Sequence, residues 1–176
     1  MDDDTSGTRR TQLRLDGNQS GSVFSINISP GGVPKRRHTG ATVTLNGLQN
    51  DDHDDKKHHG GPDRAVVLYA LERIRALQHE GHPIDIGAVG ENVTVDGLDW
   101  DTVIPGIRLR IGAQVILELT SFTAPCKTIR RSFIGEKFSR ISQAIHPGWS
   151  RVCARVISEG EIRVGDTVEV VAPPGR

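Results

Sequence analysis

The stretch Asn92-Val93-Thr94-Val95-Asp96-Gly97 is the segment that most directly indicates the fold. Its apolar and polar side chains alternate with a period of two, which is typical of a half-buried β-strand, and it ends in an Asp-Gly dipeptide that favours a hairpin turn. The stretch Thr42-Val43-Thr44-Leu45-Asn46-Gly47 repeats this arrangement. Two such segments predict a protein built from short strands and tight turns.

Further strands are predicted on both sides of these segments. Order is expected to begin at residues 22–28, and residues 115–120 alternate strictly between apolar and polar positions. Glu159-Gly160 separates the β-type runs 155–157 and 162–164, which predicts a third hairpin. With 20 glycines and 9 prolines to supply turns, this pattern predicts a closed barrel or a strongly curled sheet.

Helix is expected to be scarce. Residues 69–79 carry Leu71, Ile74 and Leu77 at helical spacing, and Gly81 follows them. A second, weaker helical pattern lies within 134–145. The predicted fold class is therefore mostly β, with one or two short helices.

The chain of 176 residues is interpreted as one domain with a tail. Residues 1–20 contain only two aliphatic side chains after the first methionine, which is too few to offset the entropy of ordering, so a disordered tail is expected. A single domain is predicted over residues 21–174.

Composition argues against several classes of partner. The 22 basic and 22 acidic residues cancel and aromatic residues make up 4%, so the chain lacks the basic excess and the stacking rings of a nucleic-acid-binding protein. No apolar run approaches the ~20 residues of a membrane span, and the first residues, Met-Asp-Asp-Asp, lack the basic and apolar regions expected of a signal peptide. Two cysteines do not form a disulfide framework. A cytoplasmic protein that binds neither nucleic acid nor membrane is expected.

Cys126 is the first candidate for chemistry, because Pro125 ends the preceding strand and places the thiol at the strand's end. Five cations and a single carboxylate follow it: Lys127, Arg130, Arg131, Lys137 and Arg140, with Glu136. Cations of this density favour a thiolate, the form that ligates metals or attacks electrophiles, and also suit a phosphate group. The alternative is that Cys126 is a small buried side chain and that the charges form a solvated face.

Other segments leave two interpretations open. Alternation places Cys153 on one face with Arg151 and Arg155, where it approaches a ligand, resolves an oxidised Cys126 or serves only for packing. The acidic and histidine-rich run 51–59 matches no metal-binding spacing and is interpreted as free loop charge. The segment 59–64, with His59 and Arg64 around two glycines, suits either oxyanion contact or a plain connection.

The function of the turn 87–92 also has two interpretations. It offers Glu91 and Asn92 as an acceptor and an amide near the barrel mouth, or it is only a tight turn. No catalytic serine elbow, phosphate loop or dinucleotide fingerprint is present in the sequence.

Five blocks of the sequence together resemble the MOSC domain, the C-terminal domain of molybdenum cofactor sulfurases, in its small stand-alone bacterial form. In order, they are Gly32-Val-Pro-Lys35, His59-Gly-Gly-Pro-Asp-Arg-Ala-Val66, Gly87-Ala-Val-Gly-Glu-Asn92 with Asp96-Gly-Leu98, Ala124-Pro-Cys126, and Arg155-Val156 with Gly160 and Gly165-Asp166. The resemblance covers residues 22–171. It departs from the family pattern at 149–155, where Cys153 has no family counterpart.

This resemblance implies a β-barrel that binds molybdenum cofactor (molybdopterin) near its rim, with Cys126 as thiolate ligand to the metal. It also implies reduction of N-hydroxylated bases or amidoximes, with electrons from a separate donor protein. His59, Arg64, Glu91 and Asn92 match family blocks and are expected to hold cofactor or substrate. Lys127, Arg130 and Arg131 are expected phosphate contacts on grounds of charge alone. The chain has no room for the pyridoxal-phosphate domain of the full-length sulfurases.

Two other functions stay open at this stage. One is a cofactor-binding or sulfur-carrier module that relays sulfur as a Cys126 persulfide, and the other is a barrel that has lost its ligand. The sequence leaves the substrate, redox partner and oligomeric state undetermined.

Overall fold

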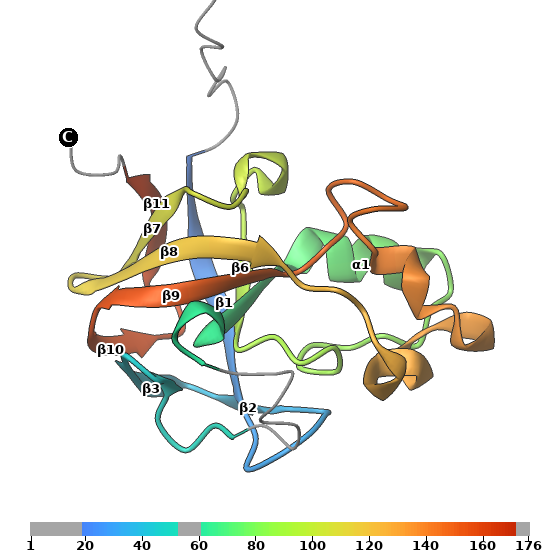
Figure 1. The fold of residues 1–176 in the computed structure, drawn as a ribbon, viewed down its shortest axis with the longest axis horizontal. Coiled ribbons are helices and arrows are strands. Elements are labelled where there is room, and N and C mark those ends of the chain that lie inside the picture. Colours follow the sequence, from blue (N-terminus) through green and yellow to red (C-terminus); the bar gives the residue numbers. More distant parts are fainter. Residues whose placement is uncertain (1–18, 53–60, 172–176) are drawn as a thin grey trace, which may run out of the picture.

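The computed structural model describes residues 19–52 and 61–171 (Figure 1), so most of the predicted tail lies outside the described residues. The strands are β1 (Ser20–Ile28), β2 (Arg36–His38), β3 (Gly40–Thr44), β4 (Gly47–Leu48), β5 (Val66–Ala70), β6 (Val93–Asp96), β7 (Arg108–Ile111), β8 (Val115–Phe122), β9 (Val152–Ser158), β10 (Gly160–Arg163) and β11 (Thr167–Val171). The helical elements are α1 (Leu71–His79) and the 3-10 turns η1 (Pro62–Arg64), η2 (Trp100–Thr102), η3 (Lys127–Ser132), η4 (Ile134–Glu136) and η5 (Phe138–Ile141).

A closed barrel forms the body of the molecule, as the sequence predicts. Its strands follow the order β11-β7-β8-β9-β5-β6-β1, and pairing of β1 with β11 closes the ring. All neighbours are antiparallel except β5 and β6, which α1 connects as a parallel pair. β2 extends β1 beyond the ring, and β10, β3 and β4 form a small second sheet.

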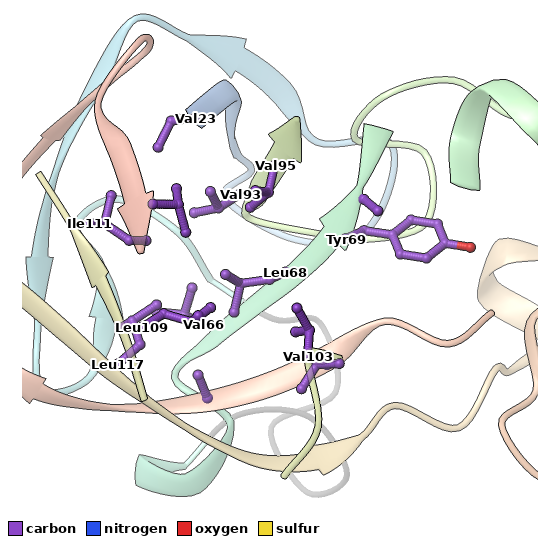
Figure 2. Close-up of a cluster of buried hydrophobic side chains, with 14 of the residues drawn as sticks. Val23, Val66, Leu68, Tyr69, Val93, Val95, Val103, Leu109, Ile111 and Leu117 are labelled. Carbon is purple, nitrogen blue, oxygen red and sulfur yellow. The ribbon is translucent and has the colours of Figure 1, made fainter. Parts of the chain in front are cut away.

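Aliphatic side chains occupy the barrel interior. Figure 2 shows Leu68, Val93, Leu109 and Leu117 converging from different strands, and each is at most 1% exposed. Burial of each such side chain contributes about 1.5–3 kcal/mol. An interior of this kind offers a polar ligand no hydrogen-bond partners, so a polar site has to lie outside the barrel.

Of the three predicted hairpins, only the one at Asn46-Gly47 is present, between β3 and β4. Gly97 does end β6, with a positive φ of 82°, but β6 pairs with β1 and β5 instead of with the next strand. The prediction of a hairpin at Glu159-Gly160 is wrong. The chain passes there from the barrel to the small sheet, because β10 pairs with β3.

The predicted helix over residues 69–79 is present as α1 and buries Leu71, Ile74 and Leu77. It begins at Leu71 because the two preceding residues complete β5. The weaker helix predicted within 134–145 is replaced by the 3-10 turns η4 and η5. Gly135 adopts a φ of 61°, and this left-handed residue interrupts any continuous helix.

Candidate functional site

Cys126 lies where β8 gives way to a long excursion of the chain. Residues 123–151, which carry η3 to η5, extend from one end of the barrel and return to it at β9 (Figure 1). The backbone N–H of Thr123 donates to the carbonyl of Arg151 at 2.9 Å, which holds the two ends of the excursion together. Cys126 follows three residues later in extended conformation, immediately before η3, and is partly exposed.

The pairing of β8 with β9 decides which side chains face this excursion. A bulge between Leu119 and Ser121 shifts the register, so that Phe122 pairs with Val152 and Ser121 with Cys153. The Thr123 hydroxyl contacts the Cys153 thiol at 3.1 Å. Thr123 and Cys153 therefore share one face of the two strands, and alternation places Arg151 on it as well.

Arg151 is the charged group of this face, and it is buried. The residue is 5% exposed, and its Nη1 donates to the carbonyl of Val89. Its Nε is buried without a hydrogen-bond partner among the described residues. Burial lowers the pKa of Arg151, while Tyr69, Glu91, Cys153 and Cys126 raise it.

Glu91 is a second buried charged group. Its Oε1 accepts from the backbone N–H of Gly87 at 2.6 Å and from the hydroxyl of Thr94 at 3.5 Å, whereas Oε2 has no partner among the described residues. Burial raises the pKa of Glu91 to about 7, although the Gly87 N–H and Arg151 lower it. Desolvation therefore dominates, and the carboxyl exchanges a proton near neutral pH.

Substitution of Glu91 by glutamine is expected to flatten the pH dependence of stability. Because the folded-state pKa lies above the ordinary value of 4.5, the folded protein binds this proton more tightly than the unfolded chain. The resulting stabilisation is complete below about pH 4.5 and is lost as pH rises through about 7. Urea denaturation across this range measures the effect.

The matched control is Glu72→Gln. Glu72 also accepts a backbone N–H at 2.6 Å, from Gly97, but it is exposed. If the wild type and Glu91→Gln lose stability with the same slope between these pH values, the assignment of the proton to Glu91 is wrong.

Asn92, next to Glu91, belongs to a buried network that connects to Glu91 through Asn27 and Thr94. Its Oδ1 accepts from the backbone N–H of Val67 at 2.9 Å, and its Nδ2 donates to Asp51 at 2.8 Å. Asp51 forms an ion pair with Lys35 at 2.6 Å, with both side chains less than 5% exposed, and also accepts from the backbone N–H of Ser29. The interpretation of Asp51 as free loop charge is therefore wrong. The partner that neutralises the Asp51 carboxylate is Lys35. The sequence indicated Lys35 only as the last residue of the block Gly32-Val-Pro-Lys35.

The remaining candidate residues are placed as follows. His59 lies outside the described residues. Arg64 is exposed at the end of η1, which packs beside β9. Lys127 and Arg131 are exposed on η3, and Arg130 pairs with Glu136 at 3.3 Å. Arg151 thus joins the turn that carries Glu91 to the excursion of the chain that carries Cys126. Direct contact of Glu91 and Asn92 with a ligand stays a prediction, because both are fully buried.

Aromatic residues fix the segment that carries Arg151. The hydroxyl of Tyr69 points out of the barrel interior (Figure 2) and donates to the carbonyl of Trp149 at 2.8 Å. The indole of Trp100 donates to the carbonyl of Ser150 at 3.1 Å. The guanidinium of Arg140 stacks 3.7 Å from the Trp149 ring centroid. Arg151 therefore comes from a tightly held stretch of backbone.

A pocket of about 270 Å³ lies beside the segment that precedes Arg151. Its lining residues are Trp100, Asp101, Val103, Ile104, Phe122, Gln143, Pro147 and Gly148. Phe122 pairs with Val152, whose side chain belongs to the core, so this pocket lies on the opposite side of the strands from Arg151.

The donor set limits how a metal can be held. Among the described residues, no group of three or more histidine, cysteine and acidic side chains is arranged to hold a metal ion. Cys126 offers one partly exposed thiol. A metal at this position would need ligands beyond the side chains that the structure describes.

Comparison with known proteins places this site in a family. The family model of the MOSC domain matches residues 55–169. The chain belongs to the MOSC domain family. This confirms the resemblance that the sequence motifs indicate, and Cys126, Arg151, Glu91 and Asn92 all lie within the matched range of the MOSC domain.

Three curated proteins illustrate the similarity. The uncharacterized protein YflK of Bacillus subtilis is 27% identical over 144 residues, which cover 80% of this chain and 63% of YflK. A protein of Gibberella moniliformis named reductase is 28% identical over 148 residues, covering 81% of this chain and 26% of its own length. Protein YiiM of Escherichia coli is 28% identical over 135 residues, covering 74% and 58%. This MOSC chain thus spans less than two thirds of each relative.

Solved structures share the fold. YiiM of Geobacillus stearothermophilus superposes with a TM-score of 0.65 at 24% identity, covering 86% of this chain and 75% of YiiM. YiiM of Escherichia coli gives a TM-score of 0.66 at 20% identity, covering 89% and 72%. Within the part of this MOSC chain that the structure describes, no helix is both long and apolar enough to cross a membrane.

Proposed function

We propose that this MOSC protein binds molybdenum cofactor through Cys126 and reduces N-hydroxylated bases or amidoximes. The observation that carries the proposal is the partly exposed Cys126 thiol, which follows β8 at one end of the barrel in a chain of the MOSC family. The name reductase of the fungal relative, in which the matched segment forms 26% of the length, supports the same class of reaction.

The residues around Cys126 fit such a cofactor. The soft sulfur of a thiolate suits molybdenum, and the absence of further ligands among the described side chains suits a metal that arrives with a dithiolene. Arg151 presents a buried Nε without a partner, which is a hydrogen-bond donor toward an anionic group. Lys127 and Arg131 are exposed on η3 and would hold the phosphate of the cofactor.

The reaction R–NHOH + 2e⁻ + 2H⁺ → R–NH₂ + H₂O defines what the site has to provide. The bound cofactor supplies two-electron oxygen-atom chemistry, and a separate donor protein supplies the electrons. Cys126 would supply the thiolate ligand of the metal. Glu91, whose pKa burial raises to about 7, would be one source of the protons consumed.

Reduction of a hydroxylaminopurine tests the proposed activity. Protein purified with its molybdenum cofactor and supplied with an artificial reductant is expected to convert this substrate to the aminopurine, as followed by chromatography. The same protein stripped of molybdenum is the control. Full molybdenum loading without turnover of either a hydroxylaminopurine or an amidoxime would refute the proposal.

A sulfur-carrier function is the second candidate. Partial exposure of Cys126 also suits a persulfide, whose outer sulfur has to be reachable by its acceptor. After incubation with a cysteine desulfurase, the intact mass would then increase by about 32 Da, the mass of one sulfur atom, and Cys126→Ala would abolish the increase. An unchanged mass removes this candidate.

A further inference from the structure

The pocket of about 270 Å³ lies where the excursion 123–151 leaves the barrel, and three parts of the chain form its wall. Phe122 comes from the end of β8, and other lining residues come from 100–104, at η2, and from 143–148, near the end of the excursion. Sites for drug-sized molecules usually measure about 300–1,000 Å³. A pocket of this volume suits one small ring system and not a complete pterin cofactor.

The walls of this pocket are suited to a flat, apolar ring. Four of the lining residues have entirely apolar side chains: Val103, Ile104, Phe122 and Pro147. Trp100 adds an aromatic surface. Its indole N–H is already used, since it donates to the carbonyl of Ser150 at 3.1 Å, so Trp100 offers the pocket its ring alone. Aromatic rings pack favourably against such surfaces.

Two polar side chains of the lining keep hydrogen-bonding capacity. Gln143 Oε1 accepts from the backbone N–H of Gly148 at 3.0 Å, which leaves Nε2 without a partner among the described residues. Asp101 Oδ1 accepts from Arg73 at 2.8 Å, and Oδ2 accepts from no residue that the structure describes. The pocket therefore carries one free donor and one free acceptor.

Gly148 brings these two groups close to each other. Its N–H holds the amide of Gln143, and a Cβ added at this glycine would lie 2.8 Å from Asp101 Oδ1. The residue has a φ of 81°, which favours glycine. Because the amide and the carboxylate border the same residue, one small ligand can contact both.

We propose that this pocket binds a planar aromatic amine: a ring nitrogen accepts from Gln143 Nε2, and the adjacent amino group donates to Asp101 Oδ2. Adenine and other aminopurines present this pair of groups on one edge. Substrate and product of the proposed reductase carry it as well, and only in this link does the inference rest on the proposed function. Binding itself is inferred from the pocket and requires neither Cys126 nor a metal.

Calorimetric titration of cofactor-free protein with adenine tests the site. We expect one adenine per chain, and purine, which lacks the amino group, should bind roughly tenfold or more weakly because it leaves the Asp101 acceptor unused. Adenosine shows whether the ligand is a free base or a nucleoside: it binds as tightly as adenine in the second case and more weakly in the first. Absence of binding by both adenine and adenosine would overturn the inference, as would equal binding of adenine and purine.

Gln143→Glu is expected to weaken adenine binding by roughly tenfold or more. This substitution keeps an oxygen for the Gly148 N–H and replaces the Nε2 donor by an acceptor. The matched control is Gln114→Glu, the same change at an exposed residue outside the pocket lining, which should bind adenine like the wild type. If Gln143→Glu does not fold, Ile104→Trp, which fills the pocket from a half-exposed position, should give the same loss. Undiminished adenine binding in the folded variant would show that the pocket is not the site.

The outcome is separable from that of the proposed function. Adenine binding together with a molybdenum-loaded protein that turns over no N-hydroxylated compound would support the pocket and refute the reductase. Turnover of a hydroxylaminopurine by a chain that binds neither adenine nor adenosine would do the reverse.

Discussion

Cys126→Ser is expected to reduce the molybdenum content of protein made in cofactor-producing cells to background. A hydroxyl does not replace a soft thiolate as a ligand to this metal, and no cluster of ligand side chains in the described chain substitutes for it. Reduction of a hydroxylaminopurine should decrease by roughly 100-fold or more, since loss of a metal ligand exceeds the effect of its supporting contacts. Elemental analysis and the turnover assay measure the two effects.

The matched control is Cys153→Ser. Cys153 is buried and contacts the Thr123 hydroxyl at 3.1 Å, and the smaller serine oxygen keeps a polar group there. Metal content should stay near that of the wild type. Equal molybdenum in wild type and Cys126→Ser would show that the thiol is not the ligand, and loss of metal only in Cys153→Ser would transfer that role to Cys153.

Asp51→Ala is expected to lower the free energy of unfolding by about 3–5 kcal/mol, because it leaves the ammonium of Lys35 buried without its partner. The substitution also removes the acceptor for Asn92 Nδ2 and for the backbone N–H of Ser29. Urea denaturation at neutral pH measures the loss.

The control for this prediction is Asp101→Ala. Asp101 pairs with Arg73 at 2.8 Å, close to the 2.6 Å of the Lys35–Asp51 pair, but its side chain is 71% exposed. Exposed pairs of this kind contribute about 1 kcal/mol or less. Similar losses for Asp51→Ala and Asp101→Ala would mean that burial does not govern the Lys35–Asp51 pair.

The barrel was predictable from local pattern. Alternation over residues 115–120 reports directly which side chains of β8 face the interior, and Val115, Leu117 and Leu119 are each at most 1% exposed. The spacing of Leu71, Ile74 and Leu77 likewise identifies the buried face of α1. In both cases the periodicity of the backbone decides burial, so a few neighbouring residues carry the information.

Strand pairing was less predictable, because a turn motif does not identify the partner of the strand that follows it. Glu159-Gly160 is a good turn, yet β10 leaves β9 and pairs with β3, more than a hundred residues earlier in the chain. Residues 134–145 have some helical spacing, but Gly135 takes a left-handed conformation there. Long-range contacts decide both outcomes.

The candidate site likewise has one part that local sequence predicts and another that depends on contacts between distant segments. The position of Cys126 at the end of β8 follows from Pro125 and the preceding alternation. The burial of Arg151 does not, since it requires the turn that carries Val89 and Glu91 to cover β9. Lys35 and Asp51 lie 16 residues apart, in two different loops. The sequence showed that the second loop is rich in aspartate, but it did not show that Lys35 is the partner of Asp51.

Closure of the barrel by its first and last strands also determines where other proteins can be attached. Ser20 pairs with Glu169, so the described chain begins and finishes on adjacent strands, at the end of the molecule opposite η3 to η5 (Figure 1). A domain fused before β1 or after β11 would be anchored there and leave the approach to Cys126 open. The architecture is therefore compatible with insertion as a module into larger polypeptides.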